Sequence, residues 1–247
     1  MNIVIISVVR DFAMYEKCIR TNPYCRGCEF APIDNREMNA GIPVGYNSFL
    51  ASRSANEDAW YVFCHEDWQP LENLGERLVD LDRESLWGVI GASTRVRWGI
   101  YHQWQLLGTI EECQKDGRAR RVIGTAVEKG CPVETFDCQC LIVHSSLIRR
   151  HHLRFDECLT FDLYVEDFCI AAKERAGVIS RVLPLLGCHW SGGRVLPRYY
   201  EQEAYLNDKW TDSCYTGTSS WVLGGRPSIL RMASVKMKTL LRKVLEG

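Results

Sequence analysis

One short segment carries residue types that suit metal-dependent chemistry. His65, Glu66 and Asp67 directly follow the apolar run at 60–64. Magnesium and manganese prefer oxygen ligands, and carboxylates commonly hold them while other positions stay open for substrate phosphates. Two carboxylates at the end of a buried strand therefore favour a divalent-cation site. A solvated turn after a strand would place acids here as well, so the segment alone leaves both interpretations open.

Two further polar segments carry groups that can take part in catalysis. Glu166 and Asp167 begin an expected helix, where a carboxylate that faces a cleft can act as a general base. The helix dipole by itself also favours acids in a first turn. His189 follows an apolar run and precedes Gly192 and Gly193. Taken alone, His189 is open to three interpretations: a metal ligand, a base, or a hydrogen-bonded histidine of the core.

Strands and helices must bring these segments together, and the pattern of apolar residues predicts where they lie. Strands are expected at 3–9, 60–63, 86–90 and 141–143, and helices at 44–54 and 165–176. The later helix has an apolar stripe at i, i+3, i+4 and i+7 and stops at Gly177. The segment 178–186 is expected to be extended, with Pro184 placing part of it at a sheet edge.

This alternation predicts an α/β fold in which helices flank a mixed, mostly parallel central sheet. Apart from Ser7, the run at 3–9 is apolar and β-branched, which is typical of a strand covered on both faces. In such sheets, ligands bind beyond the carboxyl ends of the strands. We therefore expect the site at that edge, within a single catalytic domain that spans residues 1–225.

Composition excludes several classes of protein. The chain has 247 residues and a formal net charge of -1, so no overall charge recruits nucleic acid. Large apolar residues occur throughout, which excludes a disordered or low-complexity chain. No apolar run approaches the ~18 residues that a membrane span needs, and the start shows no secretion signal. We therefore expect a cytoplasmic protein.

The 12 cysteines are expected to be reduced, because the chain is long for a disulfide scaffold and lacks a signal. Cys64, Cys140 and Cys188 lie in apolar runs, where cysteine acts as a small hydrophobe. Cys25 and Cys28 form a C-x-x-C pair, but zinc sites usually need a second pair or added histidines. A zinc or redox module built on this pair is an alternative hypothesis.

The segment 226–247 differs from the rest of the chain. It has six basic residues against Glu246 alone, with apolar residues at helical spacing. We expect a basic amphipathic helix here, outside the catalytic domain. Such a helix can lie on an anionic membrane surface, which would place the protein at the inner face of the membrane, or it can pack on its own domain.

Taken together, the three polar segments resemble those of the inverting glycosyltransferases of family 2, which have the GT-A fold. The resemblance covers about residues 1–205, beginning with ISVVRDFAMYEKCI, which is similar to the family's first strand and helix. GIPVGYNSFLASRSANEDAWYVFCHEDW resembles the helix and strand that lead to its Asp-x-Asp metal motif. FDECLTFDLYVEDFCIAAKERAGVISRVLP is similar to its base-bearing segment, and CHWSGG to its late histidine motif.

The resemblance implies that a sugar is transferred from a nucleotide-sugar donor to an acceptor hydroxyl, with inversion at the anomeric carbon. Asp67 would bind the cofactor, Mn²⁺ or Mg²⁺, with Glu66 in the same motif and His189 completing the metal site. Asp167 would be the catalytic base, and Glu166 stands next to it in the same motif.

The resemblance also implies binding residues. For the nucleotide they are Val9, Arg10, Asp34 and His65, the last of which replaces the family's usual first aspartate. For the donor or acceptor sugar they are Asp137, Trp68 and Trp190. Core packing is the alternative role for both tryptophans, and an ordinary place at a strand entry is the alternative for Asp137.

The implied partners are a nucleotide-sugar donor, such as a UDP-sugar, and a glycan or lipid-linked acceptor, so that the pathway would be glycan biosynthesis. The segment 95–121 matches nothing in the family. His65 in the metal motif also leaves an alternative function open: a catalytically inactive nucleotide- or sugar-binding protein with a GT-A-like fold.

Overall fold

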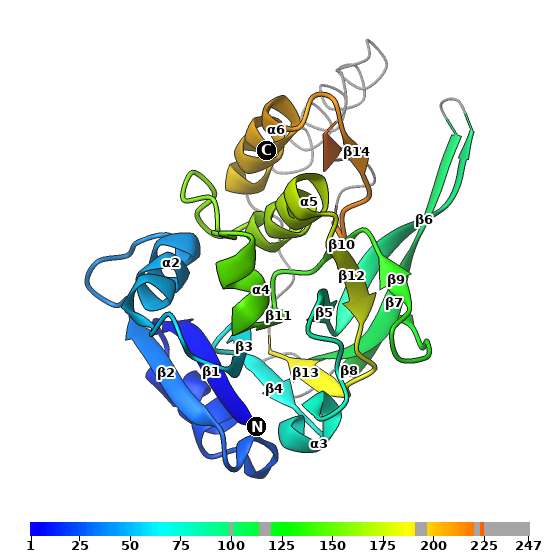
Figure 1. Ribbon diagram of the computed structural model, residues 1–247. Coiled ribbons are helices and arrows are strands. Elements are labelled where there is room, and N and C mark those ends of the chain that lie inside the picture. The colour runs from blue at the N-terminus through cyan, green and yellow to red at the C-terminus, as the bar shows by residue number, and fades with distance from the viewer. Residues whose placement is uncertain (99–100, 114–119, 191–196, 220–222, 225–247) are drawn as a thin grey trace, which may run out of the picture.

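The computed structural model describes residues 1–98, 101–113, 120–190, 197–219 and 223–224, which form two large β-sheets with surrounding helices (Figure 1). The strands are β1 (Asn2–Val9), β2 (Glu29–Asp34), β3 (Ala59–Cys64), β4 (Trp68–Pro70), β5 (Ser85–Gly88), β6 (Ile90–Trp98), β7 (Tyr101–Cys113), β8 (Arg120–Thr125), β9 (Pro132–Val133), β10 (Thr135–Phe136), β11 (Cys140–His144), β12 (Ile179–Val182), β13 (Gly187–His189), β14 (Cys214–Tyr215) and β15 (Leu223–Gly224). The helices are α1 (Phe12–Tyr15), α2 (Ile42–Ser52), α3 (Leu74–Leu78), α4 (Ser145–Arg150), α5 (Tyr164–Ala176) and α6 (Pro197–Lys209), with short η1 (Glu16–Arg20) and η2 (Pro23–Cys25).

The larger sheet has the strand order β2-β1-β3-β11-β5-β12-β9. β1 pairs in parallel with β2 and β3, and β5 with β12, whereas β11 is antiparallel to both of its neighbours and β9 is antiparallel to β12. The expected mixed sheet is confirmed, but the expectation that it is mostly parallel is wrong. A strand that pairs in parallel with the strand before it needs a long crossover connection, usually a helix. β11 instead follows β10 of the second sheet after the short link at 137–139, and it runs antiparallel to its neighbours.

The second sheet has the order β10-β6-β7-β13-β4, with β8 paired to β7. Of the segment 95–121, residues 95–98 and 101–113 belong to the antiparallel β6–β7 ribbon of this sheet, which projects from the body of the molecule (Figure 1). The single strand expected at 86–90 is instead split between β5 and β6. A side chain at Gly88 would meet the Phe136 ring at 2.5 Å, so the chain approaches that ring closely where it passes from one sheet to the other.

Local sequence explains the bounds of the main helices. α2 begins two residues earlier than expected, with Pro43 in its first turn, where the missing N–H costs nothing. α5 agrees with the expected helix and ends at Gly177, whose φ of 67° is the left-handed conformation that glycine adopts without strain. The extended segment expected at 178–186 is shorter than predicted, because β12 ends at Val182, before Pro184.

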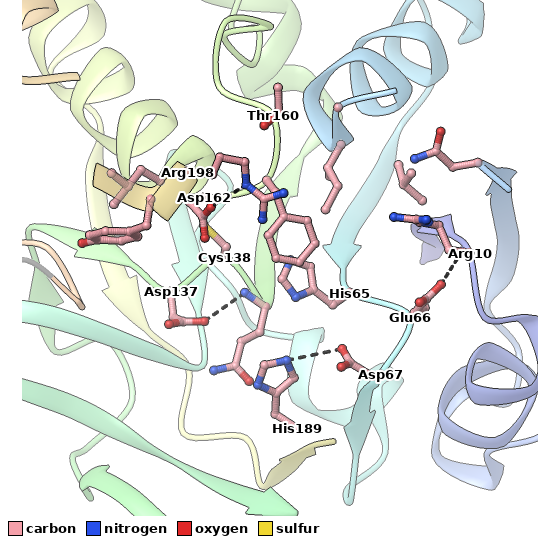
Figure 2. A pocket seen from close by; sticks show the side chains of 18 of the residues that line it. Arg10, His65, Glu66, Asp67, Asp137, Cys138, Thr160, Asp162, His189 and Arg198 are labelled. Carbon is pink, nitrogen blue, oxygen red and sulfur yellow. Dashed lines mark hydrogen bonds and ion pairs between the residues drawn. The ribbon is translucent and has the colours of Figure 1, made fainter. Parts of the chain in front are cut away.

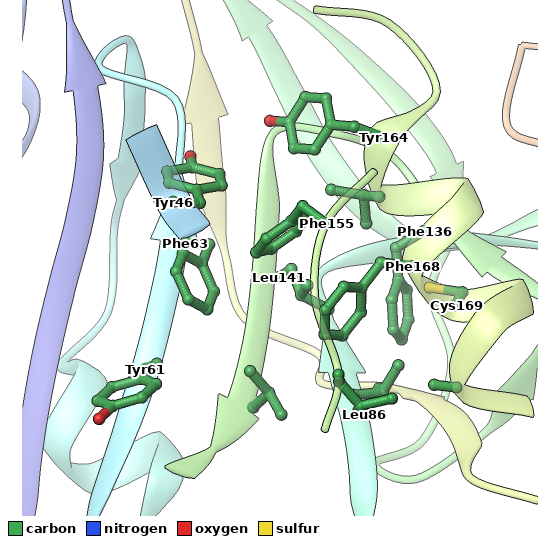
Figure 3. Close-up of a cluster of buried hydrophobic side chains, with 14 of the residues drawn as sticks. Tyr46, Tyr61, Phe63, Leu86, Phe136, Leu141, Phe155, Tyr164, Phe168 and Cys169 are labelled. Carbon is green, nitrogen blue, oxygen red and sulfur yellow. The ribbon is translucent and has the colours of Figure 1, made fainter. Parts of the chain in front are cut away.

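Two hydrophobic clusters cover the two faces of the larger sheet. In β1, Val4 and Ile6 belong to one cluster, whereas Ile3 and Ile5 belong to the other, as alternation along a strand requires. The first cluster packs against α2, α4 and α5 and is rich in aromatic rings (Figure 3). The second packs against α1, η1 and α3. The expectation that the first strand is covered on both faces is therefore confirmed.

The cysteines divide into two kinds. Cys113 and Cys188 are joined by a disulfide that links β7 to β13, so the expectation that Cys188 is a free apolar side chain is wrong. Cys64 and Cys140 are free and fully buried, as expected of small apolar residues. Cys25 and Cys28 are also free thiols, and no potential metal-ligand cluster in the described part of the chain includes them.

Two expectations concern segments outside the described residues. The basic helix expected at 226–247 lies there, and so does the glycine pair at 192–193. Within the described ranges, no helix combines the length and the apolar character needed to cross a membrane.

Candidate functional site

A cavity of about 550 Å³ lies at the carboxyl ends of β1 and β3 (Figure 2). Its walls come from the ends of these strands, the segment 35–42, the link 137–139, the segment 160–166, the end of β13 and the start of α6. This is the edge at which ligands bind in α/β sheets. The expected position of the site therefore agrees with the position of this cavity.

The cavity brings His65, Asp67 and His189 together. One potential ligand atom from each of these residues lies within 4.8 Å of the other two. β3 delivers the first two residues, and the antiparallel pairing of β13 with β4 places His189 opposite Trp68. A backbone hydrogen bond from Trp190 N–H to the Asp67 carbonyl, 3.0 Å long, fixes the same contact. The pairing of two three-residue strands thus joins residues that are far apart in the sequence.

Asp67 and His189 form a polarised pair. Oδ1 of Asp67 lies 3.3 Å from Nε2 of His189. Burial would raise the pKa of Asp67, but the neighbouring imidazole outweighs it and lowers this pKa to about 2. Burial opposes the charge of His189, yet the Asp67 carboxylate raises the pKa of the imidazole. Among the described residues, the Asp67 carboxylate is the partner recorded for the buried Nε2 atom of His189, and a cation bound between the two groups would suit both.

Glu66 does not belong to this cluster, contrary to expectation. Its Oε2 atom accepts hydrogen bonds from the backbone N–H groups of Arg10, at 2.5 Å, and Asp11, at 3.0 Å. The carboxylate therefore ties the loop after β3 to the end of β1. Glu66 lines the cavity, but its role in the structure is to join the two strand ends that form the cavity wall.

The expected base, Asp167, does not line the cavity. Its carboxylate is almost completely buried and accepts hydrogen bonds from Lys209 Nζ and Trp210 Nε1, each 2.8 Å long. These partners lie in and directly after α6, so Asp167 holds α6 against α5. Asp167 therefore has a structural role. Glu166, the other carboxylate of this pair, is the one that lines the cavity.

Glu166 lines the cavity from the first turn of α5. Burial, and after it the charge of Asp137, raises the pKa of Glu166 to about 7. Thr218 Oγ1 and Cys138 Sγ donate hydrogen bonds to the two carboxyl oxygens, at 2.8 and 3.2 Å. A carboxyl group that titrates near neutral pH inside a cavity can accept a proton from a bound hydroxyl.

The residues expected to bind the nucleotide are only partly brought together. Arg10 and His65 line the cavity, whereas Val9 points into the second core cluster and Val8 takes its place in the cavity wall. Asp34 is exposed, bonds to Arg36 and does not line the cavity. The following residue, Asn35, does line it, and its side chain is fixed by two hydrogen bonds to Ala40.

Of the three residues expected to contact the sugar, one lines the cavity. Asp137 lies in its wall. Trp68 is completely buried in the second core cluster, so the expected sugar platform there is wrong. Trp190 also lies outside the cavity wall: it donates a hydrogen bond to Gln69, and Lys17 Nζ lies 3.4 Å from its ring centre. Both tryptophans pack in the protein instead of facing a ligand.

Sequence reasoning missed an aromatic and cationic group in the cavity. The Phe161 ring stacks on the His65 imidazole, with ring centroids 5.5 Å apart, and the Arg198 guanidinium lies 4.8 Å from the centre of the Phe161 ring. Arg198 also bonds to Asp162 at 3.0 Å, which holds its charge at the cavity (Figure 2). Phe161 and Asp162 precede the Glu-Asp pair in the sequence, but no spacing rule connects them to Arg198.

Comparison with known proteins assigns no family to the chain. No protein-family model matches it, and no curated protein matches it. A solved structure described as "Crystal Structure of A197 from STIV" is 11% identical, with 93% of this chain and 96% of that chain covered and a TM-score of 0.45. A likeness at this level establishes neither the fold type nor the function.

Proposed function

We propose that the protein is a metal-dependent inverting glycosyltransferase with a GT-A type fold, which moves a sugar from a nucleotide-sugar donor to an acceptor hydroxyl. The observation that carries the proposal is the presence of two functional elements in one cavity. His65, Asp67 and His189 form a potential cation site, and Glu166 is a buried carboxyl group with a raised pKa. A cation to balance the leaving group and a base to activate the acceptor are what this chemistry requires.

The first half of the chain supports the GT-A part of the proposal. β1, β2 and β3 pair in parallel, and the segment 65–67 follows β3 directly at the cavity. Arg10, Asn35 and His65 come from beyond the carboxyl ends of these three strands and line the same cavity. A nucleotide bound at this edge would contact all three residues, as ligands of α/β sheets do.

The cation site would include Asp67 and His189, and the buried contact between the Asp67 carboxylate and Nε2 of His189 supports its fit. When bound, Mn²⁺ or Mg²⁺ supplies positive charge next to the donor diphosphate. Arg10 and Arg198 line the same cavity. The chain therefore offers two positive side chains for an anionic leaving group, and Asp162 holds that of Arg198 in place. Positive charge that is already in position lowers the barrier to departure of the leaving group.

Glu166 is the proposed base. In one displacement, the acceptor oxygen forms a bond to the anomeric carbon while the bond from that carbon to the phosphate oxygen breaks. The electron pair of the broken bond leaves with the diphosphate, and the hydroxyl proton goes to Glu166. Because attack comes from the face opposite the leaving group, the anomeric centre is inverted and no covalent enzyme intermediate is formed.

A donor screen tests this proposal. Release of UDP or GDP from a panel of their sugar derivatives is measured with Mn²⁺, with and without glycan and lipid-linked acceptors. Glu166→Gln should lower the rate about 10²–10⁴-fold, whereas Glu174→Gln, an exposed change on the same helix, should not. Tight nucleotide binding without release from any donor would contradict the transferase and support the alternative, an inactive nucleotide- or sugar-binding protein.

A further inference from the structure

His65 is held by a hydrogen-bonded chain that begins inside the core. Its Nε2 atom lies 2.9 Å from the hydroxyl oxygen of Tyr164. That hydroxyl donates a hydrogen bond of 2.8 Å to the carbonyl of Cys138. Tyr164 is fully buried at the start of α5, so the chain of contacts is shielded from water. The Nε2 atom of the imidazole is therefore bound to the protein, and Nδ1 is the second ring nitrogen.

Counting donors determines which nitrogen of His65 carries the hydrogen. A tyrosine hydroxyl has a single proton to donate. Because Tyr164 donates it to the Cys138 carbonyl, the hydroxyl oxygen must accept the hydrogen bond from Nε2–H of His65. The neutral imidazole then presents its lone pair on Nδ1. Elsewhere, on β3, the Tyr61 hydroxyl donates a hydrogen bond of 2.7 Å to the Glu57 carboxylate.

We propose that His65 is a cation ligand through Nδ1, that Tyr164 is the residue that positions it, and that the site selects manganese or cobalt over magnesium. One potential ligand atom of each of His65, Asp67 and His189 lies within 4.8 Å of the other two, so the three residues together supply two imidazoles and one carboxylate. Imidazole suits transition metals, whereas magnesium favours oxygen ligands. The inference rests on the proposed function for its choice of a divalent cation.

Tyr164 contributes because a ligating histidine depends on what its far nitrogen binds. A hydrogen bond at that position fixes the orientation and the tautomer of the ring, and its loss typically lowers metal affinity about 10–100-fold. In this chain the acceptor is a buried hydroxyl that is itself held by a backbone carbonyl. The Phe161 ring stacked on His65 further limits its rotation. The ring is thus oriented before any cation arrives.

Titration of metal-free protein with MnCl₂, CoCl₂ or MgCl₂ alone, followed by calorimetry, tests the proposal. Mn²⁺ and Co²⁺ should bind at least about tenfold more tightly than Mg²⁺, and His65→Ala and Tyr164→Phe should lower Mn²⁺ affinity about 10–100-fold. Tyr61→Phe and His152→Asn are the matched controls, and neither should change the affinity for Mn²⁺. His65→Asp should shift the preference toward Mg²⁺, because it replaces an imidazole with a carboxylate.

Pulsed electron paramagnetic resonance of the Mn²⁺ form supplies a second measurement, because it detects coordinated nitrogen. Couplings from two imidazoles are expected in the wild type and from one in His65→Ala. Equal affinity for Mg²⁺ and Mn²⁺, no bound metal, or an unchanged nitrogen signal in His65→Ala would overturn the proposal. If Tyr164→Phe does not fold, the Mn²⁺ affinity and the nitrogen couplings of His65→Ala still test whether His65 is a ligand. Sugar transfer that proceeds equally with Mg²⁺ and Mn²⁺ would support the proposed function and contradict the inferred metal selectivity. Selective Mn²⁺ binding without sugar transfer would support the metal selectivity and contradict the proposed function.

Discussion

Replacing Glu166 with glutamine should stabilise the protein at pH 8 and change its stability little at pH 4. Burial raises the pKa of this carboxyl group from 4.5 to about 7 in the folded chain. Between these values the folded state holds a proton that the unfolded state has lost. Stability therefore falls as the pH rises through this interval, and above pH 7 the fold contains a buried charge that glutamine does not have.

The size of the effect follows from the pKa. Each pKa unit corresponds to about 1.4 kcal/mol, so a rise from 4.5 to about 7 gives a cost of about 3 kcal/mol above pH 7. Glutamine has the shape of the protonated acid and can accept the hydrogen bond from Thr218. At pH 4 both states of the wild type are largely protonated, and the two proteins should have nearly equal free energies of unfolding.

Urea unfolding at pH 4, 6 and 8, followed by tryptophan fluorescence, measures the difference between the two proteins. Glu174→Gln on the same helix is the control. Hydrogen bonds from Tyr215 and Ser213 lower the pKa of Glu174, so this change should destabilise the fold at high pH, with the opposite sign. A difference between Glu166→Gln and wild type that does not vary with pH would refute the reasoning about Glu166.

Three other changes separate structural from binding roles. Asp167→Ala should cost about 3 kcal/mol in the free energy of unfolding, because it leaves Lys209 Nζ and Trp210 N–H without their buried acceptor, and urea titration measures this cost. Arg198→Ala should weaken Mn²⁺-dependent UDP binding about tenfold and leave binding of Mn²⁺ alone unchanged, as calorimetry would show. Gly177→Ala should cost about 1 kcal/mol, measured by thermal unfolding, because its φ of 67° strains any side chain; an unchanged stability would contradict the assigned helix end.

Apolar pattern was enough to predict the strands that are covered on both faces. β1, β3 and β11 are largely apolar runs, and the structure has them within one or two residues of their expected bounds. The break between β5 and β6 could not be predicted, because Val89 continues the apolar run. The passage of Gly88 beside the Phe136 ring, a contact far along the chain, decides where the first strand ends.

The site shows the same division between local and distant causes. Asp67 and His189 were both expected at the cation site, yet the pairing that joins them uses strands of three residues, too short to recognise by pattern. Adjacent residues on a helix point about 100° apart, so only one of Glu166 and Asp167 can face a given cavity. Contacts from Lys209 and the residue after it turn Asp167 away, and no local pattern reports those contacts.

Calorimetric titration with UDP and GDP, each with and without Mn²⁺, tests the central claim most directly. It compares the wild type with Asp67→Ala and with Asp34→Ala, an exposed acid outside the cavity. We predict that one nucleotide binds the wild type and Asp34→Ala only in the presence of Mn²⁺, and that Asp67→Ala does not bind it. Failure of both nucleotides to bind the wild type with Mn²⁺, or equal binding by Asp67→Ala, would contradict the proposed donor site.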